Sequence, residues 1–176
     1  MHIEQTTVRK LRITGVTNLD PVTVFLEDFE PGKGKIVIEC WGKSWAASWG
    51  AMGKDSTISE FFCQCHTGYL IKNLAVDINS EITDNEAITD GARKKILRMR
   101  RDGDLKKDQA RDLWDECANY SSVEAISHWK DVTTIFGDEW WYGLPTRPNP
   151  EYTYLVKIVQ AVQAAIETTL TAKLAA

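Results

Sequence analysis

The chain has 176 residues, of which 43% are hydrophobic and 26% are charged, and its formal net charge at pH 7 is −4. This length predicts one folded domain over residues 1–176, and the ordinary hydrophobic content argues against a largely disordered chain. The mild acidity argues against a protein whose whole surface binds nucleic acid, and without an apolar run of about 18 residues we expect no membrane-spanning helix.

Three segments rich in β-branched and other apolar residues predict strands in the N-terminal part of the chain. They cover residues 8–16, 22–29 and 36–41. Turn-forming residues separate them, because the sequence Asn-Leu-Asp-Pro at 18–21 and the paired glycines Gly32 and Gly34 favour reversal of the chain. Such short connections predict an antiparallel meander.

The pattern of residues 42–53 is compatible with two structures. Trp41, Trp45 and Trp49 would share one face of a strand, and their spacing of four residues also places them on one face of a helix. The flanking glycines and the strand that precedes the segment favour a fourth strand.

From Thr57 onward the pattern becomes helical. Thr57 and Glu60 match a capping box, and apolar residues follow at helical spacing from Ile58 to Cys65. The acidic stretch 77–90 has few apolar residues and is predicted to be a linker. Further helices are predicted over 92–101, 105–120, 123–136 and 151–174, with a loop rich in proline and glycine over 137–150.

These elements predict an α+β fold. An N-terminal antiparallel sheet of three to four strands, with a short helix, occupies residues 1–75, and a helical C-terminal half occupies residues 76–176. The pattern leaves open whether the two halves share one core. The last helix has an apolar stripe, which predicts core packing or, as an alternative, a homo-oligomer formed through this helix. The stripe consists of Leu155, Val159, Val162, Ile166 and Leu170.

Cysteine and histidine form the one cluster with metal-binding chemistry, which comprises Cys40, Cys63, Cys65 and His66. Thiolates and imidazole are zinc ligands, but the cluster lacks the two spaced cysteine pairs of a structural zinc site. The same segment is predicted to be a helix that faces the core, where cysteine acts as a small apolar residue. We therefore predict neither a metal site nor another cofactor.

No sequence motif for catalysis is present. The chain contains neither a Gly-x-Ser-x-Gly elbow nor a phosphate-binding glycine loop, so an enzyme is the less favoured class. A metal-dependent hydrolase stays an alternative, because scattered carboxylates can converge in a fold.

A basic run over residues 93–107 is the first candidate binding feature. On a helix, Lys94, Arg98 and Arg101 would line one side at spacings of four and three, while Ile96, Leu97 and Met99 would form the buried side. Such a stripe suits phosphates or an acidic protein surface, and charge runs are also typical of a solvated helix face.

The second candidate is the aromatic sequence Trp140-Trp141-Tyr142 in the loop, with Arg147 close behind it. Tryptophan, tyrosine and arginine are the residues most enriched at the energetic centres of protein interfaces. The alternative is that the loop folds back and its rings fill a gap in the core.

The segments Thr14–Val24, Ile36–Trp45 and Glu60–Cys63 resemble small accessory proteins that are encoded by tailed phages and prophages of enteric bacteria. The resemblance implies a phage protein in the cytoplasm of the bacterial host that engages host or defence machinery. It brings no catalytic residues with it.

The leading hypothesis is a non-enzymatic accessory protein that binds and inhibits a host protein or defence complex. Trp140, Trp141 and Tyr142 would be its anchors, and Arg147, Lys94, Arg98 and Arg101 would supply complementary charge. The alternatives are a nucleic-acid-binding accessory protein that uses residues 93–107 and a metal-dependent hydrolase.

Overall fold

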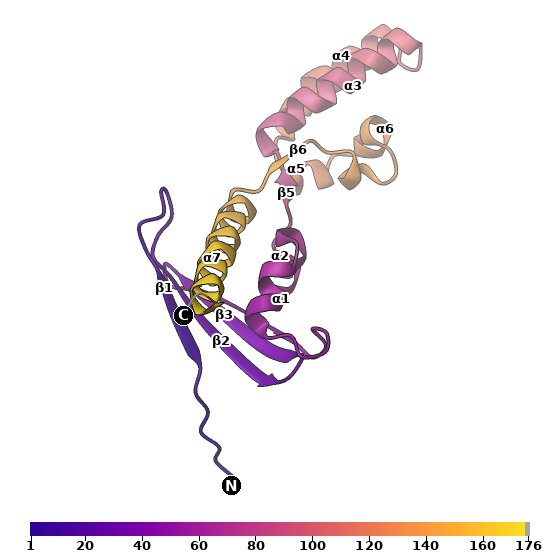
Figure 1. The fold of residues 1–176 in the computed structure, drawn as a ribbon. Helices are drawn as coiled ribbons and strands as arrows, with labels where there is room; N and C mark the ends of the chain where they lie inside the picture. The colour runs from indigo at the N-terminus through magenta and orange to yellow at the C-terminus, as the bar shows by residue number, and fades with distance from the viewer. Residues whose placement is uncertain (175–176) are drawn as a thin grey trace. The chain divides into compact units, whose positions relative to one another are not determined.

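The computed structural model describes residues 1–174 and divides the chain into two compact units. The first unit is formed by Met1–Asn79 together with the segment from Pro150 onward, and the second by Ser80–Asn149. Each unit has its own cluster of buried apolar side chains. The fold is α+β, with a sheet at the N-terminus and a helical C-terminal half, as the sequence predicted (Figure 1).

The first unit contains a four-stranded antiparallel sheet in the order β1-β2-β3-β4. The strands are β1 (Arg9–Ile13), β2 (Val22–Glu30), β3 (Lys33–Cys40) and β4 (Lys43–Trp49). Consecutive strands are neighbours, so the predicted meander and the fourth strand are both confirmed. The period of two decides the buried face, because Val24 pairs with Ile38 and both side chains are fully buried.

Trp41 corrects one detail of the prediction. Trp45 and Trp49 lie on the same side of β4, but Trp41 lies in the two-residue turn between β3 and β4 and is 81% exposed. The reason is register: Cys40 pairs with Lys43, so Trp41 and Gly42 form the reversal itself and belong to neither strand.

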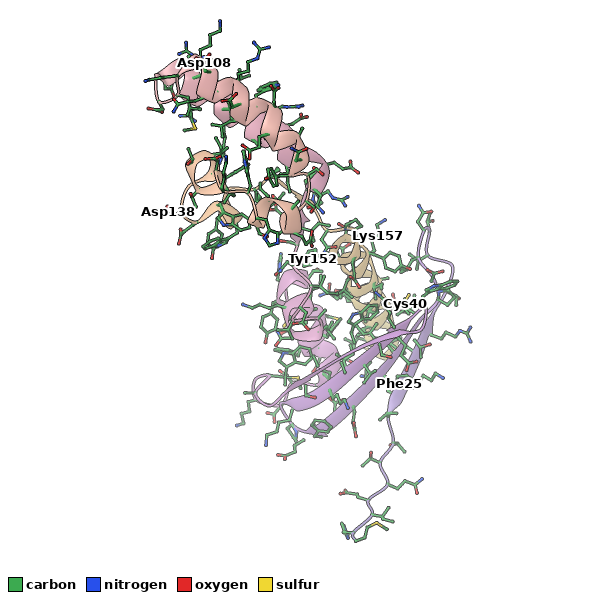
Figure 2. The ribbon with its side chains drawn as sticks, turned by 180° about the vertical axis from the view of Figure 1, so that it is seen from behind. Phe25, Cys40, Asp108, Asp138, Tyr152 and Lys157 are labelled. Atoms are coloured by element: carbon green, nitrogen blue, oxygen red, sulfur yellow. The ribbon has the colours of Figure 1, made fainter. Side chains whose placement is uncertain are left out.

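Three helices cover one face of this sheet (Figure 1). They are α1 (Ile58–Gln64), α2 (Thr67–Leu74) and α7 (Pro150–Leu174). The predicted capping box is present, because the Thr57 hydroxyl accepts a hydrogen bond from the backbone N–H of Glu60 and the Glu60 carboxylate accepts one from the backbone N–H of Thr57. The opposite face carries Phe25, which Figure 2 shows pointing away from the helices, with the Lys10 ammonium 5.5 Å from its ring centroid.

The apolar stripe of α7 is used inside the first unit. Leu155, Val159, Val162 and Ile166 are all buried in the cluster that includes the sheet, and Leu170 packs against it half-buried. A homo-oligomer formed through this helix remains a prediction.

The second unit is mostly helical, with a short two-stranded antiparallel sheet formed by its first and last elements. The strands are β5 (Glu81–Thr83) and β6 (Thr146–Pro148), and the helices are η1 (Asn85–Ala87), α3 (Ile88–Asp102), α4 (Lys107–Glu116), η2 (Cys117–Asn119), α5 (Val123–Ser127), α6 (Val132–Phe136) and η3 (Trp140–Tyr142).

Two sequence predictions in this unit need correction. The predicted linker 77–90 contains the boundary between the two units, at Asn79 and Ser80, but its residues from 81 onward include β5, η1 and the first turn of α3, and Ile88 is fully buried. Residues 123–136 form two short helices instead of one. The Trp129 side chain lies between them, where it is buried and stacks on the Tyr120 ring at 5.4 Å. The helical pattern is thus interrupted at the position where this large ring packs into the core of the second unit.

Two glycines with the same backbone conformation provide a test of the turn packing. Gly32 has φ +78°, and a Cβ atom built there would lie 2.5 Å from the carbonyl oxygen of Gly53, whereas Gly42 has φ +74° and open space around it. We expect Gly42→Ala to lower the free energy of unfolding by about 1 kcal/mol through backbone strain alone. Gly32→Ala should cost a further ~1–3 kcal/mol through the clash. Urea denaturation of both variants measures the difference, and equal losses would contradict the contact.

Candidate functional site

The three aromatic residues of η3 divide between the core and the surface. Trp140 is half-buried and packs against the apolar cluster of the second unit. Trp141 is 52% exposed and Tyr142 is 80% exposed. The sequence left two alternatives, exposed rings that bind a partner or rings that fill a gap in the core. Each describes part of the turn, because Trp140 packs against the core and the next two rings face solvent.

The exposed rings are held by ring contacts within the turn. The ring centroids of Trp140 and Trp141 lie 5.8 Å apart at 80°, in edge-to-face geometry, and those of Trp141 and Tyr142 lie 5.9 Å apart at 50°. A side chain that is already held in one orientation loses less conformational entropy when a partner binds. We call the exposed pair Trp141 and Tyr142, together with their anchor Trp140, the aromatic turn.

Lys95 of α3 lies beside Gly143, the residue that follows the aromatic turn. Its ammonium lies 4.4 Å from the ring centroid of Phe136. A Cβ atom placed on Gly143, directly after the turn, would lie 3.2 Å from the Lys95 Nζ atom. Burial lowers the pKa of Lys95. No spacing rule distinguishes this lysine from its neighbours in the basic run, so only the fold identifies it.

The exposed side of α3 carries all three predicted cations. Lys94, Arg98 and Arg101 are exposed, and Arg98 Nε lies 3.6 Å from the Asp102 carboxylate in an ion pair one turn along the helix. Both atoms of that pair are on exposed side chains, so its contribution to stability is small. The three cations are therefore available on the surface of the second unit.

Leu97 lies on this same side, contrary to the prediction that it would be buried. It is 53% exposed, three residues after Lys94 and four before Arg101. The buried stripe of α3 consists of Ile88, Ala92 and Ile96 at a spacing of four, and Leu97 lies one position beyond it. An exposed leucine among cations adds an apolar contact that the sequence pattern did not indicate.

The basic run is not continuous on the surface. Arg93 is half-buried, with its guanidinium carbon 5.0 Å from the ring centroid of Trp114. Its Nε atom is buried and has no hydrogen-bond partner among residues 1–174. Arg93 and Lys95 therefore contribute to packing, and only part of the run faces solvent.

Arg147 lies in β6, where it pairs with Ile82 of β5 and is exposed. The structure thus places Arg147, the aromatic turn and the three cations of α3 in one compact unit, Ser80–Asn149.

Three of the four candidate metal ligands have other side-chain contacts, and the fourth, Cys65, is a half-buried free cysteine. Cys40 is buried, and its Sγ atom lies 3.8 Å from the Tyr154 hydroxyl. The Cys63 thiol donates a hydrogen bond to the Gln163 carbonyl oxygen. His66 caps α2, since its Nδ1 atom accepts a hydrogen bond from the backbone N–H of Gly68.

Among the residues that the structure describes, no group of three histidine, cysteine, aspartate or glutamate side chains could hold a metal ion. Within the same part of the chain, no helix is long and apolar enough to cross a membrane.

The Cys63 thiol has a raised pKa, which predicts slow alkylation. Burial, and to a smaller extent the nearby Glu167 carboxylate, raise the pKa of Cys63 from 9.0 to about 11. At pH 8 the reactive thiolate is then roughly 100-fold scarcer, and the higher nucleophilicity of a more basic thiolate offsets part of this. We expect iodoacetamide to modify Cys63 roughly tenfold more slowly in the folded chain than in urea. Peptide mass spectrometry follows the reaction, and equal rates would refute the pKa shift.

A family model described as a phage family, Phage_phiTE_072, matches residues 1–168 of the chain. No curated protein and no solved structure matches the chain. The matched range includes the three segments on which the resemblance to phage proteins rests, as well as α3 and the aromatic turn. The chain therefore belongs to this phage protein family.

Proposed function

We propose that this phage protein is a non-enzymatic accessory protein that binds a host protein or defence complex and inhibits it by occlusion. One observation carries the proposal. Trp141 and Tyr142 are exposed on a turn whose first ring, Trp140, is half-buried and packs against the core of the second unit. Removal of apolar surface from water is favourable by about 25 cal/mol per Å². A binding partner that covers the exposed rings gains this free energy.

The exposed cations of α3, which belong to the same unit as the aromatic turn, favour an acidic protein surface as the partner. Lys94 and Arg101 flank the exposed Leu97 on this helix. An apolar centre with cations at its margin is typical of protein interfaces, in which marginal charges guide association.

A nucleic-acid partner suits the same unit less well. Arg93 and Lys95 of the basic run are turned into the protein, as described above. The neighbouring helix α4 exposes three aspartates beside two cations, Lys107 and Arg111, so it adds no net positive charge that would bind phosphates. The three aspartates are Asp108, Asp112 and Asp115.

Removal of the exposed rings tests the aromatic anchor. The full chain, immobilised in a lysate of the bacterial host, is expected to retain a host protein, and Trp141→Ala/Tyr142→Ala should reduce its recovery at least ~tenfold. Phe29→Ala is the matched control, because Phe29 is also 52% exposed but belongs to the first unit. Quantitative mass spectrometry measures recovery, and addition of the chain to the recovered protein shows whether its activity is inhibited. Equal recovery with all three proteins would remove the aromatic turn from the proposal.

Charge reversal on α3 tests the electrostatic part. Lys94→Glu/Arg101→Glu is expected to slow association roughly tenfold at low salt and to reduce its dependence on salt, because marginal charges act mainly on the association rate. Lys157→Glu, an exposed lysine of the first unit, is the control. Surface plasmon resonance with the recovered partner gives the rates. A partner that proves to be DNA or RNA, with loss of binding at high salt, would instead establish the nucleic-acid alternative.

A further inference from the structure

A small pocket in the first unit lies where the turn between β3 and β4 meets the start of α7. Its volume is about 130 Å³. Cys40, which Figure 2 labels at the end of the sheet, forms part of its wall. The pocket is lined by Asp20, Cys40, Trp41, Lys43, Trp45, Glu151 and Tyr154. Every lining residue belongs to the first unit, so the inference that follows does not rest on the proposed function.

Trp41 occupies a position in this pocket that does not favour tryptophan. Its φ is +50° and that of Gly42 is +74°, which is the signature of a type I′ turn, for which Asn-Gly is the preferred sequence. A tryptophan with positive φ strains the backbone, and its indole is also exposed to solvent. Neither feature stabilises the fold. Strain of this kind gathers at sites that bind ligands, which points to a binding role for Trp41.

Asp20 supplies a negative charge that the pocket does not neutralise. Its carboxylate accepts a hydrogen bond from the Tyr154 hydroxyl at 2.6 Å, and that hydrogen bond raises the pKa of Tyr154 to about 12, so the phenol stays neutral. The Lys43 ammonium is already paired with the Glu151 carboxylate at 2.5 Å. Among the side chains of residues 1–172, no lysine, arginine or histidine forms an ion pair with Asp20.

We propose that this pocket binds an organic ammonium group, with the rings of Trp41, Trp45 and Tyr154 as its walls and Asp20 as its counter-charge. Aromatic faces attract alkylated ammonium groups through the ring quadrupole, and a nearby carboxylate strengthens the attraction. The volume suits a trimethylammonium group or the end of a lysine side chain and is too small for a nucleotide.

Other ligand classes fit this lining less well. An anion would meet the carboxylates of Asp20 and Glu151, with only Lys43 to compensate them. A neutral apolar ligand would leave the Asp20 charge without a cation and further from water, which is unfavourable. A bare metal ion needs several convergent ligands, and among the described residues no group of three histidine, cysteine, aspartate or glutamate side chains could hold one. The ammonium itself has two sources, a free small molecule or a lysine side chain of a protein.

Titration of the full chain with choline and with its neutral carbon isostere, 3,3-dimethylbutan-1-ol, tests the proposal. We expect saturable binding of choline with a millimolar dissociation constant, and binding of the isostere at least ~tenfold weaker, since only choline carries the charge. Indole N–H signals in heteronuclear NMR spectra report the binding. Nε-trimethyllysine and unmodified lysine, each within a short peptide, are the second arm. Binding of choline alone identifies a free ammonium compound, binding of a peptide identifies a protein side chain, and both outcomes support an ammonium site.

Two variants separate binding from stability. Trp41→Asn should weaken choline binding at least ~tenfold and yet raise the urea midpoint, because asparagine suits the turn and tryptophan does not. Asp20→Asn should weaken choline binding and leave the ring walls in place. Phe29→Ala, which removes an exposed ring outside the pocket, should leave choline binding unchanged. Equal binding of the isostere, unchanged binding in Trp41→Asn, or no saturable binding of any ammonium probe would overturn the proposal.

Discussion

The apolar face of the sheet has to be covered, and the organisation of the chain follows from this constraint. Alternate residues of β2 and β3 place fully buried side chains on one face, and α1 and α2 are short helices. The long helix α7 completes the cover, although it follows β4 by about 100 residues. The first unit is therefore built from both ends of the chain, and Ser80–Asn149 is an insertion that begins and ends in the paired strands β5 and β6.

The return of α7 to the sheet also creates the pocket for which we propose ammonium binding. Glu151 and Tyr154, in the first turns of α7, meet Asp20 and the β3–β4 turn only because the apolar stripe of the helix fixes its position on the sheet. One burial requirement thus sets the core and brings residues that are distant in sequence into one pocket.

Local patterns made the elements of the first unit predictable. The period of two, the turn residues and the Thr57–Glu60 capping box each act within a few residues, so the sequence alone indicates them. The errors arise where contacts distant in sequence decide the structure. Ile88 and Trp129 are buried in the core of the second unit, and that packing creates helical structure in a polar stretch and interrupts a predicted helix.

The residues of the candidate sites also divide into those that a local sequence pattern indicates and those that only contacts distant in sequence bring into place. The aromatic turn and the cations of α3 could be found in the sequence, because each is contiguous or follows helical spacing. Lys95 could not, since its place in the fold depends on Phe136 and Gly143, which are 41 and 48 residues away in sequence. Nor could Trp41, because Trp-Gly is not the sequence that a type I′ turn favours, and only the register of β3 and β4 reveals its positive φ.

The aromatic turn and the pocket lined by Trp41 differ in whether their exposed rings stabilise the fold. In the second unit, Trp140 contributes to the core while it positions Trp141, so part of the aromatic turn stabilises the structure that presents it. Trp41 has no such role, since strain and exposure both act against folding. A side chain that weakens the fold at a pocket it lines is better evidence for ligand binding than exposure alone, because ordinary surfaces also carry exposed apolar residues. The function of the aromatic turn can therefore be established only with a binding partner. At the pocket lined by Trp41, replacement of one residue is expected to change stability and ligand binding in opposite directions, and both can be measured.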